Sequence, residues 1–183
     1  MRRPASRTIR LPLVFSLTVV GWALIAQHAA ALGSIESLPT EAEVRRVVDG
    51  DTIELRDGRL VRYIGIDAPE SRRRARPGDR EWRAGEGARW VADPEPFAEA
   101  ATEANRHLVA GRRVRLEYDV QTHDRFGRLL AYVYVGDTMV NAQLLREGMA
   151  QLLTIPPDVT YAAHFRALAE EAREARRGLW KDK

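Results

Sequence analysis

Residues 62–70 read RYIGIDAPE, and this stretch decides how the rest of the chain is interpreted. It has the pattern of an apolar strand that carries one arginine, Arg62, and ends in two carboxylates, Asp67 and Glu70. Pro69 has a fixed φ angle and no N–H, and it restricts the residue before it to extended conformations. The strand therefore ends here, and we expect both carboxylates to be held at the end of the strand rather than on a flexible loop.

Short β-like segments surround this stretch, and Asp-Gly turns at positions 49–50 and 57–58 separate the first of them. The expected strands are residues 44–48, 52–56, 59–66, 112–118 and 129–135, and the expected helices are residues 97–110, 141–147 (with Asn141 as N-cap) and 161–177. This order of elements predicts an α+β fold, a five-stranded OB-type Greek-key β-barrel with three helices.

The first 32 residues have the three-part pattern of a secretory signal peptide. Arginines precede an apolar run at residues 11–26, and small residues follow, so we expect cleavage after Ala31 and export to the periplasm or the medium. The alternative is an uncleaved membrane anchor formed by residues 11–26, although a spanning helix needs about 20 apolar residues. Residues 33–42 form a polar lead-in that we expect to be disordered, and the folded domain spans residues 43–181.

Removal of the leader changes the charge balance of the protein. The chain has 29 Lys and Arg against 26 Asp and Glu, and four of the arginines lie in the leader, which leaves 25 basic residues. Affinity for nucleic acid must therefore come from local basic clusters rather than from a global positive charge. Cysteine is absent, which excludes disulfides and thiolate metal sites.

Residues 71–96 interrupt the barrel pattern with a long, arginine-rich loop. A loop of this length inside a compact domain is usually functional or disordered. Its arginines begin two residues after Glu70. Two interpretations stay open, an electrostatic guide for polyanions and a solvated loop without that role.

A group of charged residues combines the requirements of phosphodiester chemistry. Four acids and two arginines each lie at a strand end, in a strand or at a turn: Asp49, Asp51, Asp67, Glu70, Arg62 and Arg128. Clustered carboxylates without His or Cys suit Ca²⁺ or Mg²⁺. Two arginines beside such an ion suit a phosphate, and a remaining carboxylate can act as general base. Each motif alone is more often a plain turn or strand end, so the argument rests on their joint occurrence.

One geometric condition follows from this assignment. In a straight strand Arg62 and Asp67 point to opposite faces, with Cα atoms about 16 Å apart at ~3.3 Å per residue. Both can serve one phosphate only if the strand bends, and Gly65 is the expected place.

Together these motifs resemble the staphylococcal nuclease-like (thermonuclease) family of secreted, calcium-dependent nucleases. The matching stretches are residues 48–52 (VDGDT), 62–70, 124–128 (DRFGR), 130–133 (LAYV), 140–141 (VN) and 178–180 (GLW). They extend over about residues 43–181. The resemblance implies a hydrolase that cuts phosphodiester bonds of DNA and/or RNA with low sequence specificity and leaves 3′-phosphate ends.

The resemblance also implies a role for each acid. Asp51 and Asp67 would bind Ca²⁺ together with the backbone carbonyl of Ala68, and water would complete the shell. Asp49 would lie near the metal in a supporting role. Glu70 would activate or orient the attacking water.

The basic residues would contact the substrate. Arg62 and Arg128 would bind the phosphate and stabilise the charge of the five-coordinate transition state, and Arg125 and Phe126 are further candidate substrate contacts. The family often has tyrosine at position 126 and another in the stretch 152–155, which here contains none. Since stacking on a base contributes roughly 1–3 kcal/mol, we expect weaker substrate binding than is usual in the family. We expect a monomer without an obligate protein partner.

Two rival classes are an OB-type binding module that has lost catalysis and a structural calcium-binding domain. The complete set of carboxylates and arginines favours a nuclease over both rival classes. A pure binding module would not need the whole set together, and a structural calcium domain leaves Arg62 and Arg128 unexplained.

Overall fold

The computed structural model describes residues 37–74 and 90–182. The chain divides into two compact units, Met1–Leu38 and Pro39–Lys183, and every described helix and strand belongs to the second. The expected signal peptide at residues 1–32 and most of the expected lead-in lie outside the described residues. Within the described ranges, no helix is both long enough and apolar enough to cross a membrane.

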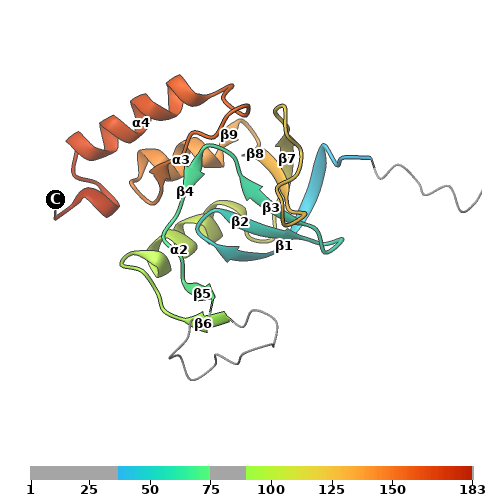
Figure 1. Cartoon of the computed structure of the whole chain (residues 1–183), viewed down its shortest axis with the longest axis horizontal. Helices are drawn as coiled ribbons and strands as arrows, with labels where there is room; N and C mark the ends of the chain where they lie inside the picture. The colour runs from blue at the N-terminus through green and yellow to red at the C-terminus, as the bar shows by residue number, and fades with distance from the viewer. Residues whose placement is uncertain (1–36, 75–89, 183) are drawn as a thin grey trace, which may run out of the picture. The chain divides into compact units, whose positions relative to one another are not determined.

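Five strands form a closed barrel (Figure 1). They are β1 (Glu41–Asp49), β2 (Thr52–Leu55), β3 (Leu60–Tyr63), β7 (Arg113–Glu117) and β8 (Leu129–Val135). The strands pair in the order β3-β2-β1-β7-β8, and β3 pairs with β8 in parallel to close the ring. With three α-helices in the described ranges, the barrel confirms the predicted OB-type fold.

The barrel closes because β1 is long and bent. Its pairing with β2 shifts register between Val44 and Arg46 and again between Val47 and Asp49, and such bulges bend a strand. Residues 41–43 consequently pair with β7, while the rest of the strand pairs with β2. The strand thus begins three residues earlier than predicted, and the end of the expected lead-in is part of the barrel.

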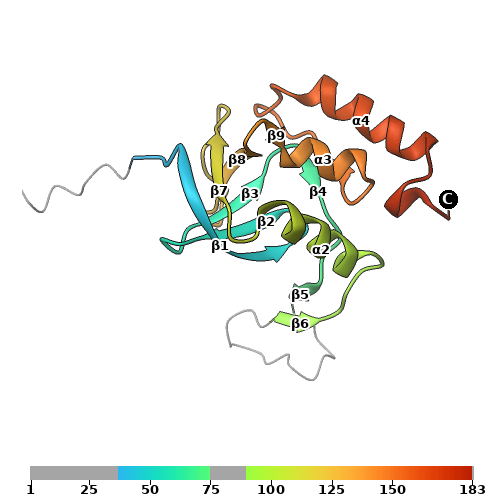
Figure 2. The same cartoon turned by 180° about the vertical axis from the view of Figure 1, so that it is seen from behind.

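The helices cover the barrel on two sides. They are α2 (Ala98–Val109), α3 (Val140–Arg146) and α4 (Ala162–Glu174), followed by a 3₁₀ turn at Gly178–Trp180. Helix α3 lies between β8 and α4, and α2 packs against β1 and α3 (Figures 1 and 2). Apolar residues from these elements and the strands form the core, including Ile53, Val61, Val114, Leu129, Val133, Leu144 and Phe165.

The prediction of Asn141 as a helix cap is wrong. Helix α3 begins at Val140, with Met139 in the capping position, so Asn141 lies inside the helix. Its side chain is fully buried and hydrogen-bonds to the backbone of the barrel instead. The Asn141 amide Nδ2 donates to the carbonyl of Ile64, and its Oδ1 accepts from the N–H of Val133, both at 2.9 Å.

Several short strands were not predicted. The expected strand at 59–66 is two strands, β3 and β4 (Ile66–Asp67), and β4 pairs with β10 (Gln151–Leu152). Strand β9 (Thr138–Met139) extends the sheet beyond β8. The ends of the expected 71–96 loop pair as β5 (Arg72–Arg74) and β6 (Trp90–Ala92), and both views place this arm close to the start of α2 (Figures 1 and 2).

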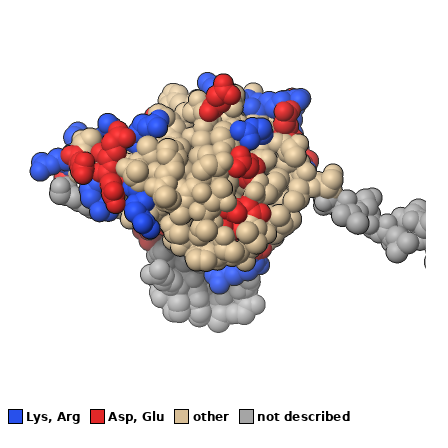
Figure 3. All heavy atoms as spheres, turned by 90° about the horizontal axis from the view of Figure 1, so that it is seen from above, with Lys and Arg blue, Asp and Glu red and all other residues tan. Residues whose placement is uncertain are grey.

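Several arginines on the barrel surface pair with acids. Arg45 and Arg46 pair with Glu54, and Arg56 pairs with Glu43. On the face shown in Figure 3, Lys and Arg side chains lie among Asp and Glu side chains, with uncharged surface between them. Binding of a polyanion therefore depends on local groups of cations.

Candidate active site

Asp51 lies in the turn between β1 and β2 and joins three parts of the site. The residue is almost fully buried, with 1% of its surface exposed. Its Oδ2 accepts from the N–H of Ala68 at 2.6 Å, and its Oδ1 accepts from the hydroxyl of Thr52 at 3.1 Å. The same carboxylate forms an ion pair with Arg62. The β1–β2 turn is thereby tied to the end of β4.

Close backbone approach explains the glycine in this turn. A Cβ atom at Gly50 would lie 2.5 Å from the Cβ of Ala68 and 2.9 Å from the Cβ of Ala101 in α2. Only a residue without a side chain fits between the two. The β1–β2 turn at Gly50, the residue after β4 (Ala68) and helix α2 (Ala101) are therefore in direct contact next to Asp51.

The bend that sequence analysis required lies at Gly65. This residue has φ +82°, a conformation that L side chains rarely adopt, and a Cβ there would lie 2.6 Å from the ring of Phe165. The bend brings Nη2 of Arg62 within 2.5 Å of Oδ1 of Asp67. Asn141 holds the neighbouring carbonyl of Ile64, so a buried hydrogen bond supports the bend.

Arg62 lies between two carboxylates of different exposure. Nη1 pairs with the buried Asp51, while Nη2 pairs with Asp67, whose side chain is 54% exposed. Nη2 is also 3.4 Å from the carbonyl of Ile66. The guanidinium is thus held in one orientation, with a solvent-facing acid on one side.

Glu70 lies three residues beyond the end of β4 in a strongly charged environment. Loss of solvent around its carboxyl group raises its pKa above the usual value, although the residue is still exposed. The negative charges of Asp49 and Asp67 raise the pKa further, and the positive charges of Arg62 and Arg128 oppose them. These four side chains therefore all lie close enough to act on the Glu70 carboxyl.

Arg128 is oriented by an acid that sequence analysis did not assign to the site. Oδ1 of Asp124 accepts from the N–H groups of Phe126 and Arg128 at 2.8 and 3.0 Å, and Oδ2 accepts from Nε of Arg128 at 2.7 Å. Burial raises the pKa of Asp124, but these hydrogen bonds more than offset it, and the net pKa is lowered. An Asp that bonds its own turn two residues ahead is the signal that could have found it.

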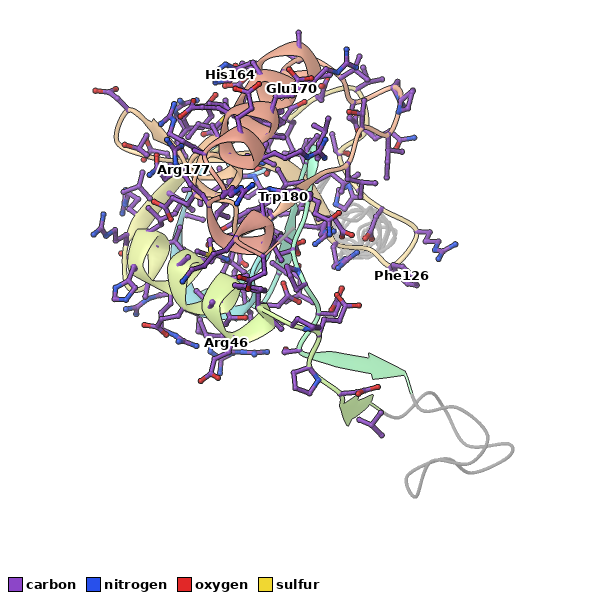
Figure 4. The ribbon with its side chains drawn as sticks, turned by 90° about the vertical axis from the view of Figure 1, so that its left-hand side faces the viewer. Arg46, Phe126, His164, Glu170, Arg177 and Trp180 are labelled. Atoms are coloured by element: carbon purple, nitrogen blue, oxygen red, sulfur yellow. The ribbon has the colours of Figure 1, made fainter. Side chains whose placement is uncertain are left out.

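Arg125 and Phe126 lie on the same loop as Arg128, between β7 and β8. Phe126 is 57% exposed, and Figure 4 shows it at the outer end of the loop, pointing away from the helices. The guanidinium carbon of Arg125 is 4.7 Å from the centre of the Phe126 ring, and that of Arg128 is 5.7 Å from it. An exposed ring flanked by two cations suits a base and its phosphates.

Asp49 is connected to the site through its side chain and its backbone. Its Oδ1 accepts from the N–H of Asp51 at 3.2 Å, and its carbonyl accepts from Nδ2 of Asn105 at 2.9 Å. Asn105 is fully buried in α2 and also accepts from the hydroxyl of Tyr63 at 2.9 Å. Sequence analysis missed Asn105, because nothing in a helical pattern shows which strand a polar residue will face.

The candidate metal ligands offer the kind of donor atom that a hard cation takes. The carboxylates of Asp51 and Asp67 and the carbonyl of Ala68 supply oxygen only, which Ca²⁺ prefers. Among residues 37–74 and 90–182, no three His, Cys, Asp or Glu side chains form a group that could hold a metal. A site here would rest on two carboxylates, a main-chain oxygen and water.

Comparison with known proteins identifies the family. The model of the family described as "Staphylococcal nuclease homologue" matches residues 60–182, more than half of the chain. The chain belongs to this family. It is 32% identical over 176 residues to the thermonuclease of Staphylococcus intermedius, covering 92% of this chain and 94% of that protein. An endonuclease of Escherichia coli described as uncharacterized is 35% identical over 147 residues, 76% of each chain.

A further relative is the endonuclease YncB of Bacillus subtilis strain 168. It is 33% identical over 140 residues, which cover 74% of this chain and 59% of that protein. Taken with the family match, these relatives show that this member of the staphylococcal nuclease family is a nuclease, a hydrolase.

Proposed function

We propose that this nuclease is a calcium-dependent endonuclease that cuts DNA and/or RNA with low sequence specificity and leaves 3′-phosphate ends. The observation that carries the proposal is the bend at Gly65. Pairing of β2 with β3 sets Arg62 beside Asp51, and the bend brings Asp67 to the same guanidinium. Arg128 and Glu70 also interact electrostatically there. Acids for a cation, cations for a phosphate and a basic carboxylate thus occupy one site.

The chain's own residues account for most of the proposed reaction. Arg62 and Arg128 bind the scissile phosphate, and their fixed guanidinium groups stabilise the charge that builds on it in the transition state. Glu70 takes a proton from the attacking water. Its raised pKa makes it a stronger base than an ordinary glutamate. Ca²⁺ bound by Asp51, Asp67 and the Ala68 carbonyl would supply electrophilic stabilisation of the phosphate.

Low sequence specificity follows from the kinds of contact available. Arginine contacts to phosphate carry no sequence information, since every nucleotide has the same backbone. Phe126 offers a face for stacking, and stacking tolerates any base. The complete set of charged groups also favours this proposal over an OB-type binding module without catalysis.

The test uses single-stranded DNA with Ca²⁺ or with a chelator, followed by analysis of the product ends. We expect cleavage only with Ca²⁺ and fragments with 5′-hydroxyl ends, which a polynucleotide kinase labels without prior phosphatase treatment. Cleavage that persists in chelator would contradict the metal requirement. Fragments that need phosphatase before labelling would contradict the 3′-phosphate products.

We further propose that residues 1–32 are a signal peptide cleaved after Ala31, so that the enzyme acts as a monomer in the periplasm or the medium. N-terminal sequencing of the protein from the producing cells tests this. An intact N-terminus in the membrane fraction would favour the alternative, in which residues 11–26 anchor the protein.

A further inference from the structure

We propose that Glu95, at the far end of the arginine-rich segment, is a positioning residue that holds Glu70 in its catalytic orientation. The inference rests on the proposed role of Glu70 as the base. It adds a residue that lies 25 positions away in the sequence and outside every motif singled out above.

Two hydrogen bonds run in opposite directions between these residues. The N–H of Glu70 donates to Oε2 of Glu95 at 3.3 Å, and the N–H of Glu95 donates to the carbonyl of Glu70 at 2.9 Å. Both polar groups of the Glu70 backbone are therefore engaged by one residue. The side chain of Glu95 supplies one of the two bonds, so a substitution can remove it and leave the other.

Glu95 is itself fixed to the rest of the site through helix α2. Its carbonyl accepts from the N–H of Ala98, the first residue of the helix, at 3.0 Å. The same helix packs Ala101 against Gly50 and bonds Asn105 to the carbonyl of Asp49. Helix α2 therefore links the turn that carries Asp51 to the backbone of Glu70.

The position of Glu70 in the chain makes such a contact necessary. The residue follows Pro69 and lies beyond Asp67, the last residue of β4 that pairs with β10. Beyond the β4 pairing, its backbone hydrogen bonds go to Glu95. A general base must lie within about 2.6–3.2 Å of its proton donor. A displacement of about 1 Å can lower a rate about 100-fold. Without the Glu95 side chain, the N–H of Glu70 loses this partner, and the base has more freedom to move.

The experiment compares kcat and KM on single-stranded DNA with Ca²⁺ for the full chain and three variants. Glu95→Ala removes the acceptor, and Glu95→Gln keeps an oxygen acceptor while it removes the charge. Glu99→Ala is the matched control, since it removes an exposed acid from the first turn of the same helix. We expect Glu95→Ala to lower kcat about 5- to 50-fold with KM unchanged within twofold. We expect Glu95→Gln and Glu99→Ala to stay within about threefold of the wild type, and all melting temperatures to be similar.

The proposal is overturned if Glu95→Ala keeps its kcat within twofold, or if Glu95→Gln loses as much as Glu95→Ala. The double variant with Glu70→Gln adds a second test. Since Glu95 acts through Glu70, the change to Ala should have no further effect once the base is gone, and an additive loss contradicts the coupling. A fully active Glu70→Gln would instead refute the proposed function, which is a distinguishable failure.

Discussion

At the scale of single residues, Arg62 has two tasks that the structure separates. In the proposed reaction its guanidinium binds the phosphate, and in the structure it also neutralises Asp51, a carboxylate with 1% of its surface exposed. Removal of one partner of a buried pair leaves an uncompensated charge, which typically destabilises a protein by about 3–5 kcal/mol.

The first prediction concerns the substitution Arg62→Ala. We expect cleavage to fall by orders of magnitude. We also expect the free energy of unfolding in chelator to fall by about 3–5 kcal/mol, with part of this loss restored by Ca²⁺, because the ion would neutralise Asp51. Chemical denaturation with and without Ca²⁺ measures both effects.

Arg128→Ala is the matched control for this prediction. It should lose comparable activity but only about 0–1 kcal/mol of stability, since its partner Asp124 keeps backbone hydrogen bonds and the pair is partly exposed. Equal loss of stability in both variants would contradict the assignment of Arg62 as the partner of a buried charge.

The second prediction concerns pH. Glu70 acts as base only when ionised, and its pKa is raised, so the acid limb of the pH–rate profile should lie above the range of an ordinary glutamate. The folded state binds this proton more tightly than the unfolded state, so the contribution of Glu70 to stability falls as pH rises through its pKa. A rate profile measured between pH 4 and 9 tests the first statement. A limb at or below the pKa of a free glutamate would contradict it.

At the scale of elements, the bend between β3 and β4 has a testable cost. Gly65→Ala introduces a side chain at positive φ and drives its Cβ into the Phe165 ring. We expect a loss of about 2–5 kcal/mol in the free energy of unfolding, from strain of about 1–2 kcal/mol and overpacking of about 1–3 kcal/mol. Gly58→Ala is the control, because Gly58 has φ +90° and no atom within 4 Å of the added Cβ. Similar losses in both variants would show that packing against Phe165 is not the reason for glycine at position 65.

Strand β5 allows the two interpretations of the arginine-rich segment to be separated. Replacement of Arg72–Arg74 by alanine should weaken binding of single-stranded DNA if the strand guides the polyanion. It should also reduce the slope of log affinity against log salt by up to about 2, at about 0.7 per lost phosphate contact. The control replaces Arg45, Arg46 and Arg56, which pair with acids on the barrel. An unchanged slope in the β5 variant favours the solvated loop.

At the same scale, sequence patterns predicted elements whose residues alternate or repeat regularly. Strand β8 lies at the predicted residues, and the bend is at Gly65 as expected. Strands β4 and β10 have two residues each, too few for any period to show. Asn141 was misread because asparagine is common at helix caps, and only the folded chain reveals that Ile64 and Val133 need its amide.

At the scale of the whole molecule, the barrel brings together residues that are far apart in the sequence. The parallel pairing of β3 with β8 sets the strand of Arg62 beside the strand that follows Arg128. The charged residues were recognisable from the sequence because their motifs resemble a family. Asp124 could have been found from the pattern of its own turn, since its partners Phe126 and Arg128 follow within four residues. Asn105 and Glu95 could not, since their roles depend on partners that are distant in the sequence.

The most direct test of the account is the rate at which Glu70→Gln cuts single-stranded DNA with Ca²⁺, measured beside the wild type. The account predicts a rate lower by orders of magnitude, with a melting temperature at neutral pH equal to or above that of the wild type, because an ionised group with a raised pKa has been removed. An undiminished rate would contradict it, and Glu70 would then have no part in activating the water.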